Sequence, residues 1–339
     1  MSARPGRHAA SLWSRMRSRR RPEISPRTYF LVAAAALVAL VGIVFTGTAV
    51  RVTGSGLGCP DWPNCYHDGR FVAETGSHSF IEFGNRLLTS VVGFAAAAAG
   101  LLAFFRVPFR RDLAILGMLL PLGVIAQAIL GGMTVWYGLA PGYVMAHYAL
   151  SMVILVAAGA LVWLGRPAHD DDPRPAADRT TARAVWGLFV LGALTIFVGT
   201  ASTAAGPHAG GSGTGDLVNR LDFRGADTLG WLINRHGALA TALGLAAVAT
   251  WWLARRRGAD RELQKRLTRI CVLMAAQGVI GIVQYRLELP AEAVWVHVAL
   301  ATLLWVGIVL ASVQAGSPLR EPTAAAMGGA GAPASAARP

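Results

Sequence analysis

Apolar residues in this chain are gathered into eight runs of about 20 residues, and polar residues are concentrated in the segments between them. An α-helix of about 20 apolar residues spans the ~30 Å hydrocarbon core of a bilayer. The pattern therefore predicts an all-α integral membrane protein with eight transmembrane helices. The predicted helices are Tyr29–Val50, Ile81–Phe105, Leu113–Met133, Tyr143–Trp163, Ala184–Ala205, Leu229–Trp252, Ile270–Val283 and Ala293–Val313, of which the seventh is the shortest.

The polar positions within these runs recur in the second half of the chain. Gln127 precedes His147 by twenty residues, and Gln277 precedes His297 by the same interval. A fixed internal period indicates a duplicated architecture. The sequence thus predicts a tandem repeat of two pseudo-symmetric four-helix bundles. A further match pairs Phe45-x-Gly47-Thr48-Ala49 with Phe197-x-Gly199-Thr200-Ala201.

The runs and the repeat together predict the domain organisation. The C-terminal end is rich in Ala, Gly and Pro, a composition typical of disorder. The expected parts are a basic N-terminal tail (1–28), a first four-helix bundle (29–165) with an outer cysteine loop (51–80), a linker (166–183), a second bundle (184–315) and a disordered tail (316–339).

Composition and charge agree with a membrane protein and fix its expected orientation. Only 14% of the residues are charged, whereas globular proteins average about 25%. With the N-terminus in the cytoplasm, 24 of the 31 Lys and Arg residues fall on the cytoplasmic side. This asymmetry follows the positive-inside rule and predicts that both termini are cytoplasmic. The net charge of +13 therefore reflects topology, and we expect no nucleic-acid partner.

The cysteines fall in two different environments. Cys59 and Cys65 lie six residues apart in the first outer loop, where an oxidising compartment favours a disulfide. Such a bond could be a structural staple or redox-active, and the sequence leaves both open. Cys271 lies within the seventh predicted helix, where a small buried hydrophobic residue is expected.

Four ligand-capable side chains lie at similar depth near the outer ends of the predicted helices. Asn85, His147, His236 and His297 each fall within the first two turns of an outside-to-inside helix. An imidazole at membrane depth indicates a functional site, although an interhelical hydrogen bond is the simpler alternative. His236 and His297 suit bis-histidine ligation of haem. In the first half His147 faces Asn85, which holds the position of His236 and is a poor ligand for iron.

Charged residues near these positions suggest further roles. Glu82 lies three residues before Asn85, so both can face the bundle interior. Its carboxylate could act as a general base or stabilise a developing cation, or it could simply pair with Arg86. Guanidinium groups suit haem propionates, and Arg86 and Arg235 are the best placed for this.

The first outer loop and three other segments resemble the haem A synthase family. The loop reads Arg51-Val-Thr-Gly-Ser-Gly-Leu-Gly-Cys59-Pro-Asp-Trp-Pro-Asn-Cys65. The other segments are Ile81-Glu82-Phe83-Gly84-Asn85-Arg86, Gln127-Ala-Ile-Leu-Gly-Gly132 and the two Gln-x19-His units. The resemblance covers all eight predicted helices, and it is the combination of the segments that is specific.

The resemblance implies an enzyme that oxidises the C8 methyl of haem O to a formyl group. The product, haem A, is used by haem–copper terminal oxidases. It further implies a bacterial plasma (inner) membrane location, an electron acceptor, contact with haem O synthase and with membrane lipid, and compatibility with an oligomer. The roles implied are haem b binding for His236 and His297, substrate haem binding for His147 with Asn85 and Arg86, catalysis for Glu82, and a disulfide for Cys59 and Cys65.

One position departs from the family pattern. The second helix usually reads Glu-x-x-His-Arg, and this chain has Asn85 in place of the histidine. The substrate iron would then be five-coordinate on His147, or water or His78 would take the sixth position.

Three other functions are weighed against this one. A di-haem electron-transfer cytochrome without macrocycle chemistry would need a fourth histidine. A transporter would place its polar residues near the midplane. An assembly subunit would need neither Glu82 nor the cysteine pair.

Overall fold

The computed structural model describes residues 23–70, 76–171 and 176–318, and these residues are predominantly helical. Within them, eight helices are long and apolar enough to cross a membrane, which agrees with a multi-pass membrane protein. These eight are α2 (Pro26–Val52), α3 (Ser77–Leu102), α4 (Arg111–Trp136), α5 (Pro141–Gly165), α7 (Arg179–Ala205), α8 (Asp227–Arg256), α9 (Arg261–Arg286) and α10 (Ala291–Ala315). The short helices are η1 (Ala103–Phe105) and α6 (Pro167–Asp171).

All eight predicted spans are confirmed, but several helices extend beyond their apolar runs. The largest difference is in α9, which begins at Arg261 rather than Ile270. Its first turns are charged, so hydropathy alone does not reveal them. The side chain of Asp260 caps this end by accepting from the backbone N–H groups of Glu262 and Leu263. In the same way α7 begins at Arg179 because Asp178 caps it, within the segment predicted to be a linker.

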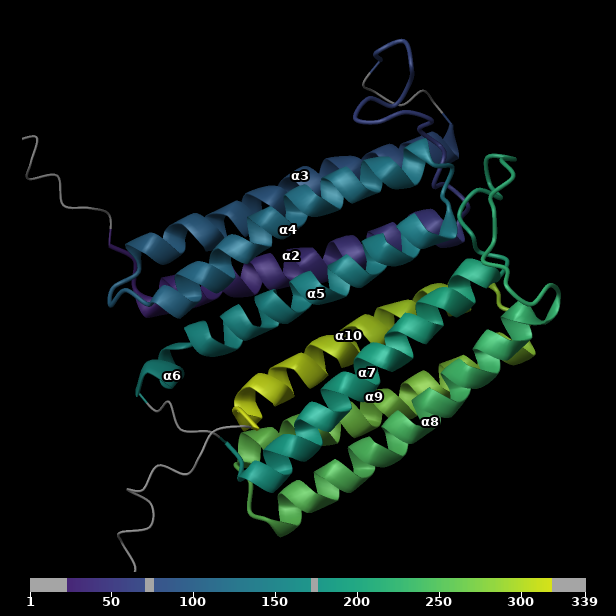
Figure 1. Ribbon diagram of the computed structural model, residues 1–339. Coiled ribbons are helices and arrows are strands. Elements are labelled where there is room, and N and C mark those ends of the chain that lie inside the picture. Colours follow the sequence, from purple (N-terminus) through teal and green to yellow (C-terminus); the bar gives the residue numbers. More distant parts are fainter. Residues whose placement is uncertain (1–22, 71–75, 172–175, 319–339) are drawn as a thin grey trace, which may run out of the picture.

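The helices pack in two groups along the chain (Figure 1). Helices α2, α3, α4 and α5 contact one another in a closed ring, and α7, α8, α9 and α10 form a second ring. Each ring has its own cluster of buried apolar residues. The two clusters are joined by α10, whose Trp305 and Val309 belong to the core of the first ring.

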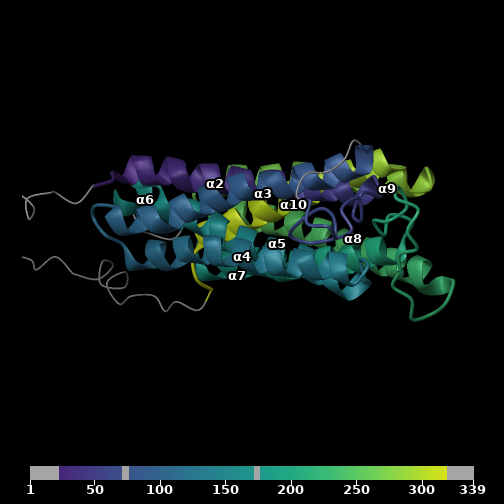
Figure 2. The ribbon, with the colours of Figure 1, turned by 90° about the horizontal axis from the view of Figure 1, so that it is seen from above.

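Contacts between the two rings run through α10, through the packing of α5 against α7, and through the loops at one end. The indole N–H of Trp305 donates to the carbonyl of Met152 at 3.0 Å, and that of Trp295 donates to the carbonyl of Phe45 at 2.9 Å. The long loops 53–70 and 206–226 lie together at one end of the molecule in both views (Figures 1 and 2). Backbone hydrogen bonds from Gly56 to Gly210 and from Gly213 to Gly54 join these loops.

The tight turns α4–α5 and α9–α10 have the same backbone form. Each contains two consecutive residues in the left-handed region: Gly138 and Leu139 in the first turn, and Glu288 and Leu289 in the second. In each turn the second of these residues donates its backbone N–H at 2.7 Å to a carbonyl five residues earlier. Only the first turn has a glycine, so the second turn carries more backbone strain.

The tails predicted at 1–28 and 316–339 lie mostly outside the described residues, since the description begins at residue 23 and ends at 318. The first and last long helices begin and end at the same end of the molecule, opposite the long loops (Figure 1).

Candidate functional site

The two histidines of the second half face each other across a cavity. His236 on α8 and His297 on α10 have ring centroids 6.1 Å apart, with ring planes inclined by 68°. Both rings line a cavity of about 930 Å³ between α7, α8, α9 and α10. Small-molecule and cofactor pockets have volumes of about 300–1,000 Å³. The predicted pair is thus brought together at a space large enough for a sizeable ligand.

A hydrogen bond fixes the orientation of the His236 ring. Its Nδ1–H donates to the carbonyl of Thr195 at 3.0 Å, one helix away on α7. This bond leaves Nε2 with its lone pair available to a metal. The ring also packs closely on α7, because a Cβ added at Gly199 would lie 2.7 Å from His236 Cε1. A glycine is therefore required beside the ring.

His297 is positioned by α9 in a different way. The side-chain amide of Gln277 donates to the backbone carbonyl of His297 at 3.0 Å. A Cβ added at Gly281 would lie 3.4 Å from His297 Cε1, and the buried Nδ1 has no hydrogen-bond partner in the described part of the chain. Gln277 therefore sets the depth of the histidine, and Gly281 provides the space for its ring.

These residues fit a haem held between two imidazoles. Imidazole nitrogens bind metals at about 2 Å, so rings 6.1 Å apart leave room for one metal ion between them. The described residues contain no group of three or more His, Cys, Asp or Glu that could hold a bare metal ion. Haem needs at most two protein ligands, since the porphyrin supplies the rest.

The first half repeats the arrangement around His147 on α5. The side-chain amide of Gln127 donates to the carbonyl of His147 at 2.9 Å and to Ser151 Oγ at 2.6 Å. A Cβ added at Gly131 would lie 3.3 Å from His147 Cε1, and Nδ1 is again buried and without a partner among the described residues. The two Gln-x19-His units therefore make the same contacts in both halves.

Asn85 on α3 stands where His236 stands in the second half. A Cβ added at Gly47 would lie 4.0 Å from Asn85 Nδ2, and Gly47 is the repeat partner of Gly199. The hydroxyl of Thr46 donates to Asn85 Oδ1 at 2.7 Å. The equivalence expected from the spacing is thus reproduced by the contacts.

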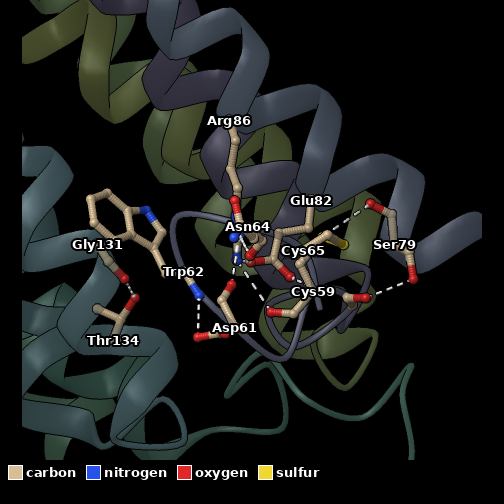
Figure 3. A network of polar contacts seen from close by, with 11 residues as sticks. Cys59, Asp61, Trp62, Asn64, Cys65, Ser79, Glu82, Arg86, Gly131 and Thr134 are labelled. Carbon is tan, nitrogen blue, oxygen red and sulfur yellow. Dashed lines mark hydrogen bonds and ion pairs between the residues drawn. A yellow bond between two sulfur atoms is a disulfide. The ribbon is translucent and has the colours of Figure 1, made fainter. Parts of the chain in front are cut away.

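The cysteine loop is bonded to α3 through Glu82 and Arg86 (Figure 3). Cys59 and Cys65 form a disulfide, as predicted, and both are fully buried. Glu82 Oε2 accepts from the backbone N–H of Cys59 at 2.7 Å, and Glu82 Oε1 accepts from Arg86 at 2.6 Å. Glu82 therefore makes the ion pair with Arg86 that the sequence offered as one of its alternatives.

Arg86 completes this network from the same helix. Its guanidinium donates to the backbone carbonyls of Cys59, Asp61 and Asn64 at 2.7–3.2 Å. These N–H groups of the Arg86 guanidinium therefore bond to the cysteine loop in this structure. The loop residue Trp62 packs on α4, where a Cβ added at Gly132 would lie 3.0 Å from its ring.

The arginines that line the cavity are Arg51 and Arg286, neither of which the sequence singled out. Arg51 comes from α2 in the first half, and its Nε donates to the carbonyl of His208 at 3.0 Å. Arg235 is not among the lining residues, and its guanidinium lies 5.3 Å from the centre of the Trp231 ring. The approach of α2 to the second ring brings Arg51 to the cavity, and no local pattern encodes that approach.

Of the remaining outer histidines, His67 is exposed and pairs with Asp61 of its own loop at 3.3 Å, whereas His78 and His208 contact other segments. His78 Nδ1 lies 2.8 Å from Ser55 Oγ, and His208 Nε2–H donates to the carbonyl of Leu289 at 2.7 Å. His78 precedes Asn85 by seven residues on the same helix, a rise of about 10 Å. Cys271, expected to be buried, is half-exposed and lines the cavity.

Comparisons with known proteins point to one group. The sequence matches the profile of the COX15-CtaA family, described as cytochrome oxidase assembly protein, over residues 28–72 and 69–310. A heme A synthase of Lysinibacillus sphaericus is 32% identical over 127 residues, which are 37% of this chain and 41% of that protein. A heme A synthase of Methylobacterium radiotolerans is 28% identical across 88% of this chain and 92% of that protein. A heme A synthase of Bacillus mycoides is 29% identical over 116 residues, or 34% of this chain and 37% of that protein.

Proposed function

The chain belongs to the COX15-CtaA family of cytochrome oxidase assembly proteins, and from this premise we propose that it is a haem A synthase. In this proposal it oxidises the C8 methyl of haem O to a formyl group in the bacterial plasma membrane. The product would supply haem–copper terminal oxidases. The observation that carries the proposal is the facing pair of His236 and His297 at the cavity, together with His147 in matching contacts in the other half.

The proposed work is divided between the two halves. The second half (184–315) would bind haem b as a resident cofactor, and the first half (29–165) would bind haem O as substrate. When bound, haem b supplies a redox centre that can take up the electrons removed from the methyl group. Both termini would be cytoplasmic, which places the sites and the disulfide loop near the outer face.

Named residues hold each group in this scheme. His236 and His297 would ligate the iron of haem b, with Thr195 fixing the His236 tautomer. Arg51 and Arg286 line the same cavity and suit the propionates. His147 would hold the substrate iron, and Gln127 sets its depth.

Glu82 is the proposed catalytic carboxylate. It lies in the turn before Asn85 and accepts bonds from Arg86 and from the backbone of Cys59. Taking up a proton at either oxygen would weaken one of these bonds. Proton uptake at Glu82 would therefore be coupled to the hydrogen bonds that hold the cysteine loop on α3. Through Glu82, Arg86 would be connected to the first site.

Analysis of the extracted haems tests the proposal. The protein is purified from cells that also supply haem O, and its haems are separated by chromatography. Haem B together with haem A or a hydroxylated haem O is expected. His236→Ala and His297→Ala should lose haem B, whereas His147→Ala should keep haem B and stop the conversion. His67→Ala, an exposed loop histidine that pairs with Asp61 and does not line the cavity, is the matched control.

One outcome would replace the proposal. Haem B alone, with supplied haem O bound but never altered, would identify a bis-histidine electron-transfer cytochrome. The His236–His297 pair would serve that function equally well, so the product analysis is decisive.

A further inference from the structure

The two halves differ at one ligand position, and the difference extends to its surroundings. His147 and His297 have the same glutamine and the same glycine as neighbours. On the opposite helix, His236 in the second half is replaced by Asn85 in the first. The site around His147 thus shares the glutamine and the glycine with the second half, but differs from it on the opposite helix.

Asn85, on the helix that differs between the halves, has its own hydrogen-bonding partner. Thr46 donates to Asn85 Oδ1 at 2.7 Å, and the repeat partner of Thr46 is Val198, which has no hydroxyl. The hydroxyl therefore occurs only in the half that has the amide. Asn85 Nδ2 has no acceptor within the described residues and remains a hydrogen-bond donor.

The backbone carbonyl that corresponds to the one orienting His236 has a hydroxyl beside it in the first half. In the second half the carbonyl of Thr195 accepts from His236 Nδ1–H. Its repeat partner is the carbonyl of Ile43, which lies 3.2 Å from the Thr46 hydroxyl. The hydroxyl has one proton, which it donates to Asn85 at the shorter distance, so Thr46 lies beside this carbonyl without bonding to it. The first half is built for an amide at this position.

His78, the imidazole that the sequence offered as a replacement ligand, lies too far along its helix to take this role. His78 lies about two helical turns from Asn85 and contacts Ser55 in the interlocked loops. An amide is a poor ligand for haem iron, but amide donors in a distal pocket favour the binding of small polar ligands.

From these contacts we propose that the two haem sites have different coordination, with the substrate iron held by His147 alone. Asn85 keeps the opposite position open for an exchangeable small ligand, water or dioxygen, and its N–H donates to that ligand. Thr46 is the positioning residue that orients the amide. This inference rests on the proposed function, because it takes the substrate haem to enter the first half.

Spin state and carbon monoxide binding test the coordination directly. In protein loaded with haem B and haem O, the ferric electron paramagnetic resonance spectrum should contain one low-spin and one high-spin haem. After reduction, carbon monoxide should bind about half of the haem, since only one of two sites is open. Fully low-spin haem with no carbon monoxide binding would overturn the proposal.

Substitutions in the first site test the roles of Asn85 and Thr46. Thr46→Val with Asn85→His copies the second half into the first, and should convert the high-spin signal to low-spin and abolish carbon monoxide binding. Asn85→Ala should keep the site open but weaken retention of the small ligand. An unchanged spin state in the double variant, with both haems still bound, would contradict the assignment.

The extracted haems separate this inference from the proposed function. An open first site without any haem A product would refute the proposed synthase activity and support the proposed coordination. Haem A formed by a protein whose haems are all low-spin and bind no carbon monoxide would support the synthase activity and refute the proposed coordination.

Discussion

The carboxylate of Glu82 accepts a hydrogen bond from the backbone N–H of Cys59 at 2.7 Å, so a buried acidic group of α3 is bonded directly to the disulfide loop. Its second oxygen accepts from Arg86, which in turn binds three carbonyls of that loop. The loop is therefore folded around a buried ion pair. Removing either charge leaves the other without its partner.

Replacing Glu82 by alanine is expected to lower the free energy of unfolding by about 3 kcal/mol, because Arg86 is left as an unpaired buried charge. The loosened loop should also expose the Cys59–Cys65 bond to reductant. Thermal unfolding in detergent and the rate of disulfide reduction by a thiol measure the two effects.

Glu262→Ala is the control for Glu82→Ala, since Glu262 pairs with Lys265 at an exposed position. This substitution should leave the unfolding midpoint close to that of the wild type, because exposed ion pairs contribute little. If Glu82→Gln abolishes haem conversion while both unfolding and disulfide reduction stay at the wild-type values, the carboxylate acts in the chemistry rather than in holding the loop.

Arg51→Gln is expected to weaken haem b binding about tenfold, or about 1.4 kcal/mol, because a cationic group that lines the cavity is removed. Loss of a positive charge should also lower the reduction potential of the haem. Titration with haem and a potentiometric titration measure these changes. Arg235→Gln, outside the cavity lining, should change neither, and equal effects of the two variants would contradict the role of Arg51.

Glu288→Gly is expected to raise stability by about 1 kcal/mol, because Glu288 is a non-glycine residue in the left-handed region. Gly138 holds the equivalent place in the first half, so Gly138→Ala should lower stability by a similar amount. Thermal unfolding of both variants gives the comparison. A destabilised Glu288→Gly protein would show that the side chain contributes more than the strain costs.

Asp178 should make the N-terminal end of α7 sensitive to acid. Burial raises the pKa of its carboxyl, but hydrogen bonds from Arg257 and from the backbone and side chain of Thr181 outweigh burial, so the pKa lies below its usual value. Its stabilising effect is therefore present above the unfolded pKa of about 3.9 and is lost as the pH falls through the lower folded value.

Asp178→Asn keeps the helix cap and removes the charge. The variant should be less stable than the wild type at pH 6, and the gap should narrow as the pH falls below about 3.9 towards the lower folded pKa of Asp178. Unfolding midpoints across this range provide the measurement, and a gap that stays constant would rule out the ionised carboxyl as its source.

The sequence predicted the helices and the paired histidines because both depend on local or periodic patterns. Apolar length identifies a span, and a repeated Gln-x19-His spacing places a ligand at the same depth twice. The prediction of α9 was nine residues short because its first turns are charged, and helix caps rather than hydropathy determine where such a helix begins.

Contacts between the halves could not be read from the chain. Arg51 lines a cavity formed mainly by the other half, and Trp295 of α10 donates to the carbonyl of Phe45 on α2. Neither contact follows from spacing, because each depends on how one group of helices lies against another. Arg235 was predicted to lie at the site because it is next to His236 in the chain. Adjacency in the chain does not determine which side chains line a cavity.

The position of Trp305 also has a consequence for biosynthesis. This residue of the last helix is buried in the core of the first ring and bonds to Met152. A chain leaving the ribosome delivers α2 to α5 long before α10. Part of the core of the first ring is therefore exposed to lipid until α10 has been synthesised. A chain truncated before α10 should be recognised by membrane quality control even though its first four spans are complete.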